Sequence, residues 1–400
     1  MSKRLHSRTV LGTVAIAAAT ICGSASALDS NGYFRAGPGA TKKNAARACY
    51  GLNGPGLKYR LGNECDFYGE FFLSEKFDLE GVETKVQFTP NLWNGGTDSN
   101  DAKLGLAEMF VEGKGFDIAP DASFWIGKRY YARADVHIVD TFFTQQDGVG
   151  AGVKGIAMGP GKLAVAYFRD DDGDDDTAGD QPGNRLSAEF YDVAANPGGK
   201  LRFVGTLTDG TYTGGKNGVA LTAQHTQDNL FGLGGNNNLW LQYAQGSANL
   251  NTGFGNLGAG SGTKGWRVVE ALSWQVGRFG GQAMALWQQD RDDDGNKSNS
   301  ISVGGRASYA FTKHFKLVSE LGYSQKKPDG GETQKLTKFT LAPTLSTGSG
   351  FWSRPELRLY VTTAKWNAAA NAAAGENGLT GIGDGRTRGT SYGAQVEIWW

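Results

Sequence analysis

The sequence has no apolar run long enough to form a membrane-spanning helix. The apolar stretch near the amino terminus, from Val10 to about Gly23, is shorter than the ~18 residues that a membrane-spanning helix requires. No later apolar stretch reaches that length. The chain also has no excess of charge, because 40 Lys and Arg residues balance 40 Asp and Glu residues. Proteins that bind nucleic acid usually present a basic surface, so this composition argues against such a partner. Any residence in a membrane must come from β-strands.

Residues typical of catalysis and of nucleotide binding are also scarce. The few histidines beyond residue 27 lie in no recognisable nucleophile motif. Asp135 and Asp140 could be imagined as the carboxylate pair of a glycosidase, but the sequence shows no apolar pocket that would raise a carboxyl pKa. The one GxGxxG match, Gly253–Gly258, has neither a strand before it nor a helix after it. We therefore predict neither an enzyme nor an organic cofactor.

The first residues are typical of a targeting segment. Three basic residues lead into the apolar run, which is followed by a small-residue cleavage site at Ala25–Ala27. We predict a signal peptide over residues 1–27 and a mature chain that begins at Leu28. No shift in composition divides residues 28–400, so we expect a single domain.

Cysteine is rare, and only Cys49 and Cys65 follow the predicted signal peptide. Export takes the chain to an oxidising compartment, where two such cysteines are expected to pair. Closing this loop should stabilise the fold by about 3 kcal/mol in the chain-entropy account. A zinc site is the weaker interpretation, because two thiols without nearby histidines make a poor ligand set. We predict a disulfide here and no metal.

Apolar and polar residues alternate along nearly the whole mature sequence. Val82–Phe88 and Leu357–Thr362 are examples, and this is the pattern of a β-strand with one apolar and one polar face. Clusters of Gly, Asn and Asp separate such segments, and glycine is abundant at 61 residues. About 370 mature residues, at roughly 20 per strand and connection, give sixteen to eighteen strands. The sequence therefore predicts an all-β fold, a single large antiparallel transmembrane β-barrel.

The last ten residues, Ser391–Trp400, carry this pattern most clearly. One face holds Tyr392, Ala394, Val396, Ile398 and Trp400, and the other holds Gly393, Gln395, Glu397 and Trp399. In a barrel the first face meets lipid and the second meets a water-filled lumen, so Trp399 becomes an indole on the watery side. Such a ring suits the apolar face of a sugar. The alternative is the edge strand of a soluble β-sandwich.

Two acidic tracts admit a second interpretation as cation sites. Asp170–Asp176 is most simply a solvated loop. Asp290–Gly295 matches the first half of a calcium loop, but Ile301 occupies the twelfth position, where a bidentate Glu is needed, and flanking helices are absent. We interpret this tract as a hairpin loop and keep calcium as the alternative.

Near the amino terminus, aromatic and charged residues fall on the same strand faces. Tyr33 shares a face with Arg35, and Tyr68 shares one with Glu70. Carbohydrate binding needs this combination, because a pyranose offers a C–H face for stacking and hydroxyls for charge-assisted hydrogen bonds. Girdle tyrosines beside ordinary pore charges are the alternative.

Several whole motifs, found in one order along nearly all of the mature chain, strengthen the first interpretation. They are Lys58–Cys65, Gly127–Tyr131 with Arg133 and Asp135–Asp140, Thr222–Gln227, Trp352–Pro355 with Ala364–Trp366, and Gly393–Trp400. Together they resemble the maltoporin family. This resemblance implies an 18-stranded barrel, a homotrimer in the bacterial outer membrane, and facilitated diffusion of maltose and maltodextrins along a path of aromatic rings.

The resemblance also implies roles for individual residues. It implies an aromatic slide of Tyr33, Tyr68, Trp93, Phe231, Trp352 and Trp399, and a polar track of Arg35, Arg60, Glu70, Arg133, Asp135 and Asp140. Trp93 would stand at the entrance, on a loop that leans into a neighbouring subunit's pore. Periodicity alone also places Tyr33, Tyr68 and Trp399 in the lumen. For Trp93 and Trp352 an interfacial or loop-packing role is the alternative, and Phe231 falls in a stretch that aligns poorly.

Three positions depart from the family pattern. Phe142 stands where the family has a constriction tyrosine, Ala107 where it has a track arginine, and Gln145 where it has an aspartate. These changes bear on which sugar passes rather than on the transport class. A general diffusion porin, which needs only charges at its constriction, is the alternative to a sugar-selective channel.

Overall fold

The computed structural model describes residues 28–42, 48–95, 102–171 and 181–400. The predicted signal peptide lies outside these residues. In the described part of the chain, no helix is long and apolar enough to cross a membrane. The elements in chain order are β1 (Asp29–Ala36), β2 (Gly39–Thr41), β3 (Phe67–Leu79), β4 (Val82–Asn94), β5 (Lys103–Lys114), β6 (Ser123–Arg129), β7 (Ala134–Val136), η1 (His137–Val139), β8 (Thr141–Thr144), β9 (Gly148–Met158), β10 (Gly161–Asp170), β11 (Gly183–Asn196), β12 (Gly199–Gly210), β13 (Asn217–Asp228), η2 (Leu230–Gly232), β14 (Asn236–Gly246), β15 (Lys264–Val276), β16 (Phe279–Arg291), β17 (Lys297–Ala310), β18 (Phe315–Pro328), β19 (Gln334–Ser346), β20 (Glu356–Trp366), α2 (Ala368–Ala373) and β21 (Arg388–Trp399).

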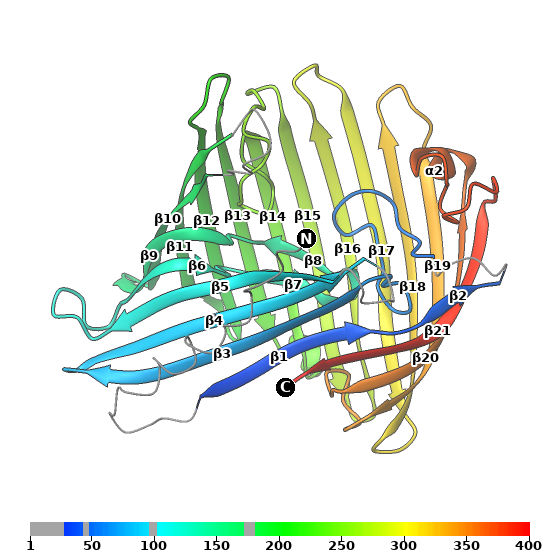
Figure 1. Cartoon of the computed structure of the whole chain (residues 1–400), viewed down its shortest axis with the longest axis horizontal. Helices are drawn as coiled ribbons and strands as arrows, with labels where there is room; N and C mark the ends of the chain where they lie inside the picture. Colours follow the sequence, from blue (N-terminus) through cyan, green and yellow to red (C-terminus); the bar gives the residue numbers. More distant parts are fainter. Residues whose placement is uncertain (1–27, 43–47, 96–101, 172–180) are drawn as a thin grey trace, which may run out of the picture.

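All described strands except β7 and β8 form one antiparallel sheet that closes on itself (Figure 1), and β7 and β8 pair with one another in the loop between β6 and β9. Closure occurs at β1, which pairs with β3 on one side and with β21 on the other. β2 also pairs with β21, so β1 and β2 are two parts of one wall strand. Pro38 interrupts that strand because it has no backbone N–H to donate. The wall therefore has 18 strands, which confirms the predicted all-β barrel.

Burial along the wall is the reverse of that in a soluble sheet. In β20, Leu359 is 64% exposed on the outside, while Arg358 and Thr362 are buried on the inside. In β21 the same alternation buries Glu397 completely. The edge-strand interpretation of the last residues is wrong, because β21 pairs with β20 on one side and with β1 and β2 on the other.

The two ends of the barrel differ in the length of their connections. Residues 80–81, 159–160, 197–198 and 277–278 are two-residue turns at one end, which we call the short-turn end. Although the turns of residues 115–122 and 347–355 also belong to the short-turn end, the longest connections lie at the opposite end. Two of these, the first loop (residues 42–66) and the third loop (residues 130–147), pack against the inner wall. In the third loop, Ile138 and Phe143 share one apolar cluster with Trp240 of β14 and Leu286 of β16.

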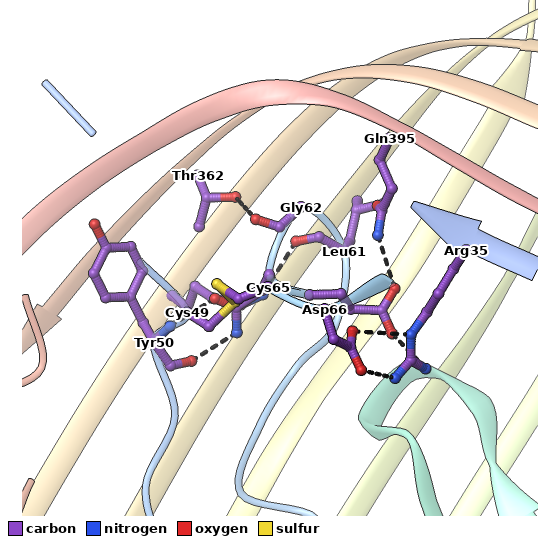
Figure 2. The surroundings of a disulfide bond; sticks show 12 residues. Arg35, Cys49, Tyr50, Leu61, Gly62, Cys65, Asp66, Thr362 and Gln395 are labelled. Atoms are coloured by element: carbon purple, nitrogen blue, oxygen red, sulfur yellow. Dashed lines mark hydrogen bonds and ion pairs between the residues drawn. A yellow bond between two sulfur atoms is a disulfide. The ribbon is translucent and has the colours of Figure 1, made fainter. Parts of the chain in front are cut away.

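The first loop carries the disulfide and is fixed to strands from the far end of the sequence. Cys49 and Cys65 are bonded, with their Cα atoms 5.9 Å apart, which confirms the predicted pair. Figure 2 shows Thr362 of β20 donating to the Gly62 carbonyl, at 3.2 Å. It also shows Gln395 of β21 reaching toward this loop, where its side chain donates to Glu64 at 2.8 Å. The loop therefore narrows the lumen instead of extending outward.

The acidic tract at Asp290 lies at the hairpin between β16 and β17. The Asp293 carboxylate accepts hydrogen bonds from the amides of Gly260 and Thr263, at 2.6 and 2.9 Å, and Asp292 accepts one from the Asn296 amide. These hydrogen bonds lower the pKa of both carboxyl groups. Among the described residues, no group of three or more acidic, His or Cys side chains could hold a metal ion. The carboxylates join two neighbouring turns. Most of the other acidic tract, Asp170–Asp176, lies outside the described residues.

Candidate functional site

A cavity of about 490 Å³ lies inside the barrel, between the two inserted loops and the wall strands β1, β3, β4 and β21; we call it the pore cavity. It contains all six predicted track residues, four of the six predicted slide residues, and the predicted constriction residue. Its lining is Tyr33, Arg35, Arg60, Asp66, Tyr68, Glu70, Trp93, Tyr130, Arg133, Asp135, His137, Asp140, Phe142 and Trp399.

Strand pairing places the aromatic rings side by side. Tyr33 of β1 lies directly opposite Trp399 of β21, and Tyr68 of β3 lies directly opposite Trp93 of β4. Directly opposed residues share one face of a sheet, so all four rings point into the lumen. The centroids of the Tyr33 and Tyr68 rings are 6.2 Å apart.

Trp93 differs from the expectation in its setting. It lies within β4 and not on a loop, so its ring lines the cavity of its own barrel. The ammonium of Lys103 lies 5.9 Å from the centroid of this ring.

Trp352 lies just outside the pore cavity, in the turn of residues 347–355 between β19 and β20. Its ring centroid is 6.4 Å from that of Trp399 and 5.3 Å from that of His137. The Arg354 guanidinium lies 3.9 Å from the centroid of the Trp399 ring. Trp352 therefore extends the row of rings from the cavity toward the short-turn end.

Phe231 is not brought into this row. It lies in η2, the turn between β13 and β14, and its side chain is 87% exposed. It does not line the pore cavity.

The charged groups of the cavity lie beside the rings and compensate one another. The Arg35 guanidinium is 5.5 Å from the centroid of the Tyr68 ring. Arg35 lies 3.1 Å from Glu64, 2.8 Å from Asp66 and 3.0 Å from Asp140. Burial alone would raise the pKa of Asp140, but Arg60 and Arg35 hold it below its ordinary value. Asp140 therefore stays ionised at neutral pH, and its ion pairs with the two arginines hold it in place.

Arg60 connects the first loop to the last strand. Its guanidinium lies 2.6 Å from Glu64 and 3.1 Å from Glu397, and it donates to the Tyr33 hydroxyl at 2.5 Å. The Nδ1 atom of His137 lies 3.4 Å from the same guanidinium. Burial lowers the pKa of His137 to about 4, so this imidazole is neutral at neutral pH. The sequence analysis missed the partners Glu64 and Glu397, which are far apart in the chain.

Tyr130 is a further lining residue that the sequence analysis did not select. Its hydroxyl donates to the Glu70 carboxylate at 2.5 Å, and the Tyr68 hydroxyl donates to the same carboxylate. The Arg133 guanidinium stacks 3.1 Å from the centroid of the Tyr130 ring. The available signal was its position in the motif Gly127–Tyr131, three residues before the predicted track residue Arg133.

The three departures from the family pattern also have definite positions. Phe142 presents its ring to the cavity, 4.6 Å from the Arg133 guanidinium. Ala107 lies at a β-bulge of β5, and its neighbour Glu108 accepts a hydrogen bond from the Tyr130 amide at 2.9 Å. The Gln145 side chain donates to Asp147 at 2.8 Å, and Asp147 pairs with Arg133. A carboxylate is thus still present close to Gln145, whereas Glu108 beside Ala107 carries the opposite charge to the arginine of the family pattern.

Taken together, this arrangement is a passage in which aromatic rings and fixed ionic groups lie side by side: Arg35 lies directly opposite Tyr68, and Glu70 directly opposite Tyr33. It can stack against apolar ring faces and exchange hydrogen bonds with hydroxyl groups. The carboxylates Asp135 and Asp140 lie among the guanidinium groups of the track.

Comparison with known proteins agrees with this architecture. Residues 28–400 match the model of the LamB porin family. Among solved structures, OccAB1 of Acinetobacter baumannii is similar with a TM-score of 0.50 and 13% identity, over 93% of this chain and 96% of that chain. OpdQ of Pseudomonas aeruginosa gives a TM-score of 0.49 and 9% identity, over 94% and 99% of the two chains. Identities this low concern the fold alone. Because the family match covers nearly the whole chain and the closed barrel fits it, the chain belongs to the LamB porin family and is a channel of the bacterial outer membrane.

Proposed function

We propose that this porin is a sugar-selective channel, which passes maltose, maltodextrins or related oligosaccharides by facilitated diffusion. The observation that carries the proposal is the row formed by Tyr68, Tyr33, Trp399 and Trp352, with ionic groups beside it. The ring centroids of Tyr68 and Tyr33 are 6.2 Å apart, those of Trp399 and Trp352 are 6.4 Å apart, and Tyr33 lies directly opposite Trp399. A sugar can therefore contact the next ring before it leaves the previous one.

The charged groups of the cavity support the same mechanism. Arg35, Arg60 and Asp140 line the cavity and are held in place by one another, so they do not need to reorganise when a solute arrives. Hydroxyl groups of a sugar can replace the water that these groups bind. Each contact is weak, and a channel needs binding that is strong enough for entry and weak enough for exit. Phe231 remains a proposed slide residue only if a sugar reaches the turn in which it lies.

Planar-bilayer conductance with a panel of disaccharides and maltodextrins tests the proposal. Tyr68→Ala and Trp399→Ala should each weaken the block of ion current by maltotriose by about five- to tenfold, since a stacking contact contributes about 1 kcal/mol or more. Ion conductance should remain. Trp266→Ala is the matched control, because that ring is exposed on the outer wall. Block that is unchanged in both lumen variants would refute the sugar-selective mechanism.

A general diffusion porin is the second candidate, and the dense charges around Arg35 and Arg60 favour it. Such a channel would show no saturable block by any sugar. Liposome swelling with sugars and with size-matched uncharged polyols separates the two, because only a selective channel passes maltose faster than a polyol of equal size.

We also propose, from family membership, a homotrimeric assembly and a signal peptide over residues 1–27. Native mass spectrometry of the detergent-solubilised protein measures the first. Amino-terminal sequencing of the protein isolated from outer membranes tests whether the mature chain begins at Leu28.

A further inference from the structure

A second cavity, of about 730 Å³, lies inside the barrel against the wall strands β5, β6 and β9–β12; we call it the basic chamber. Five of its lining residues are cationic and two are acidic. The cations are Lys114, Arg129, Lys154, Lys162 and Arg202, and the acids are Asp121 and Glu189.

The basic chamber faces the lumen and lies toward the short-turn end. Ile126 and Phe203, which alternate with lining residues along β6 and β12, are exposed on the outer wall. Lys114 is the last residue of β5 before the turn of residues 115–122, and Lys162 follows the two-residue turn between β9 and β10. In outer-membrane barrels the short turns are periplasmic, so this chamber lies near the periplasmic mouth.

The cations of the chamber outnumber the carboxylates that pair with them. Arg129 and Lys154 share the single carboxylate of Glu112, at 2.5 and 3.1 Å. Lys162 and Lys200 likewise share that of Asp192, at 3.1 and 3.2 Å.

The remaining charges complete this balance. Arg202 pairs with Glu189 at 2.7 Å. Lys114 makes no ion pair within the described part of the chain. With Lys200 counted, six cations face four carboxylates, which leaves a positive excess in a space open to water.

The basic chamber is continuous with the solute path proposed above. Tyr130 lines both the pore cavity and the basic chamber. Tyr131 and Tyr191 also line the chamber, so aromatic surface lies beside the cations. A solute that leaves the pore cavity past Tyr130 therefore meets the basic chamber next.

We propose that the basic chamber is a second solute site, which binds the anionic group of an acidic saccharide. Arginine and lysine are charge-assisted donors to carboxylate and to phosphate, and an excess of like charge in a cleft raises the local concentration of anions. The inference deepens the proposed function and rests on it in one respect, that saccharides enter the lumen. It adds a class of solute, sugars that carry a carboxylate or a phosphate, to the neutral sugars of the aromatic row.

Planar-bilayer measurements with glucose, glucuronate and glucose 6-phosphate test this site, because the three probes share one ring and differ in charge. Both anionic sugars should block the ion current at lower concentration than glucose. The preference should shrink between about 0.1 M and about 1 M KCl, as the screening length falls from about 10 Å to about 3 Å. Glucuronate and glucose 6-phosphate separate the two sources of negative charge.

The variant Lys114→Gln/Lys154→Gln should raise the half-blocking concentration of both anionic sugars by about fivefold for each lysine removed. This factor corresponds to the attraction between two unit charges about 4 Å apart in a water-like medium. Glucose should be unaffected. Lys297→Gln removes a cation at the opposite end of the barrel and is the matched control. Lys114→Gln alone breaks no ion pair, so it keeps the test decisive if the double variant does not assemble.

Anionic sugars that bind no better than glucose, or equally well in the lysine variants, would overturn the site. These outcomes differ from a failure of the proposed function, which is measured by maltotriose block in Tyr68→Ala. A channel could lose one property and keep the other.

Discussion

Reduction of the Cys49–Cys65 disulfide should loosen the first loop without releasing it. The bond closes a segment of 16 residues. In the chain-entropy account, a loop of that size contributes about 3 kcal/mol. If this stabilisation acts on docking of the loop, its loss raises the population of the undocked loop by about 200-fold.

Other interactions decide whether the loop stays docked on average. The described residues of the loop make at least nine side-chain hydrogen bonds with β17–β21, and these involve Ser302, Glu320, Ser324, Lys326, Lys338 (two bonds), Thr340, Thr362 and Gln395. At about 1 kcal/mol each they exceed the contribution of the disulfide. We therefore expect the mean conductance to change little and brief openings to a larger conductance to become far more frequent.

Single-channel recording before and after addition of dithiothreitol measures this effect. The Cys49→Ser/Cys65→Ser variant should match the reduced protein and should not respond to the reductant. Removing two wall contacts as well, with Thr340→Val/Thr362→Val, should lengthen the openings. A reduced channel with the same opening frequency as the oxidised one would refute the reasoning, and so would one that stays permanently in a larger conductance.

Two further predictions concern charge. Burial lowers the pKa of His137 to about 4 and raises the pKa of Asp135. Both groups therefore take up protons as the pH falls from about 7 toward 4. The cavity becomes more positive, so the anion selectivity of the channel should increase. The same low pKa means that the contribution of His137 to stability is lost as the pH falls from its unfolded pKa of about 6.5 toward 4. Reversal potentials in a KCl gradient measure this selectivity. If the double variant His137→Gln/Asp135→Asn showed the same change of reversal potential with pH as the unaltered protein, the assignment would be contradicted. Glu320→Gln should destabilise the barrel by about 3–5 kcal/mol, because Arg306 and Lys338 would lose the buried carboxylate that lies 2.7 and 3.1 Å away. Urea unfolding in detergent measures this loss, and Glu332→Gln, at an exposed position, is the control. Equal stability of the two variants would show that the buried network is unimportant.

The parts of the fold that the sequence predicted depend on local periodicity. In Leu357–Val361 of β20 and Tyr392–Ile398 of β21, every second side chain is apolar or aromatic on the outer face, and that pattern alone assigns the inner and outer faces. It also placed Tyr33, Tyr68 and Trp399 on the lumen side. The disulfide followed from composition, because only two cysteines were available to pair.

The parts that it did not predict depend on contacts between distant segments. Trp93 lies in a strand although Pro90 and Asn91, which strands disfavour, precede it, because a bulge in β5 accommodates them. Tyr130 becomes part of the cavity only because the third loop turns inward. Phe231 matches a slide position of the family in sequence, but the turn that holds it lies away from the other rings. No periodic pattern encodes these placements.

The contact between Arg60 and Glu397 has a consequence for assembly of the channel in the membrane. One partner lies in the first loop and the other lies in β21, three residues before Trp400, and they are 3.1 Å apart. The charged part of the passage therefore cannot be complete until β21 has been inserted beside β1. A barrel interrupted late in its insertion would leave Arg60 without this carboxylate, so correct filtering of solutes appears only in the finished molecule.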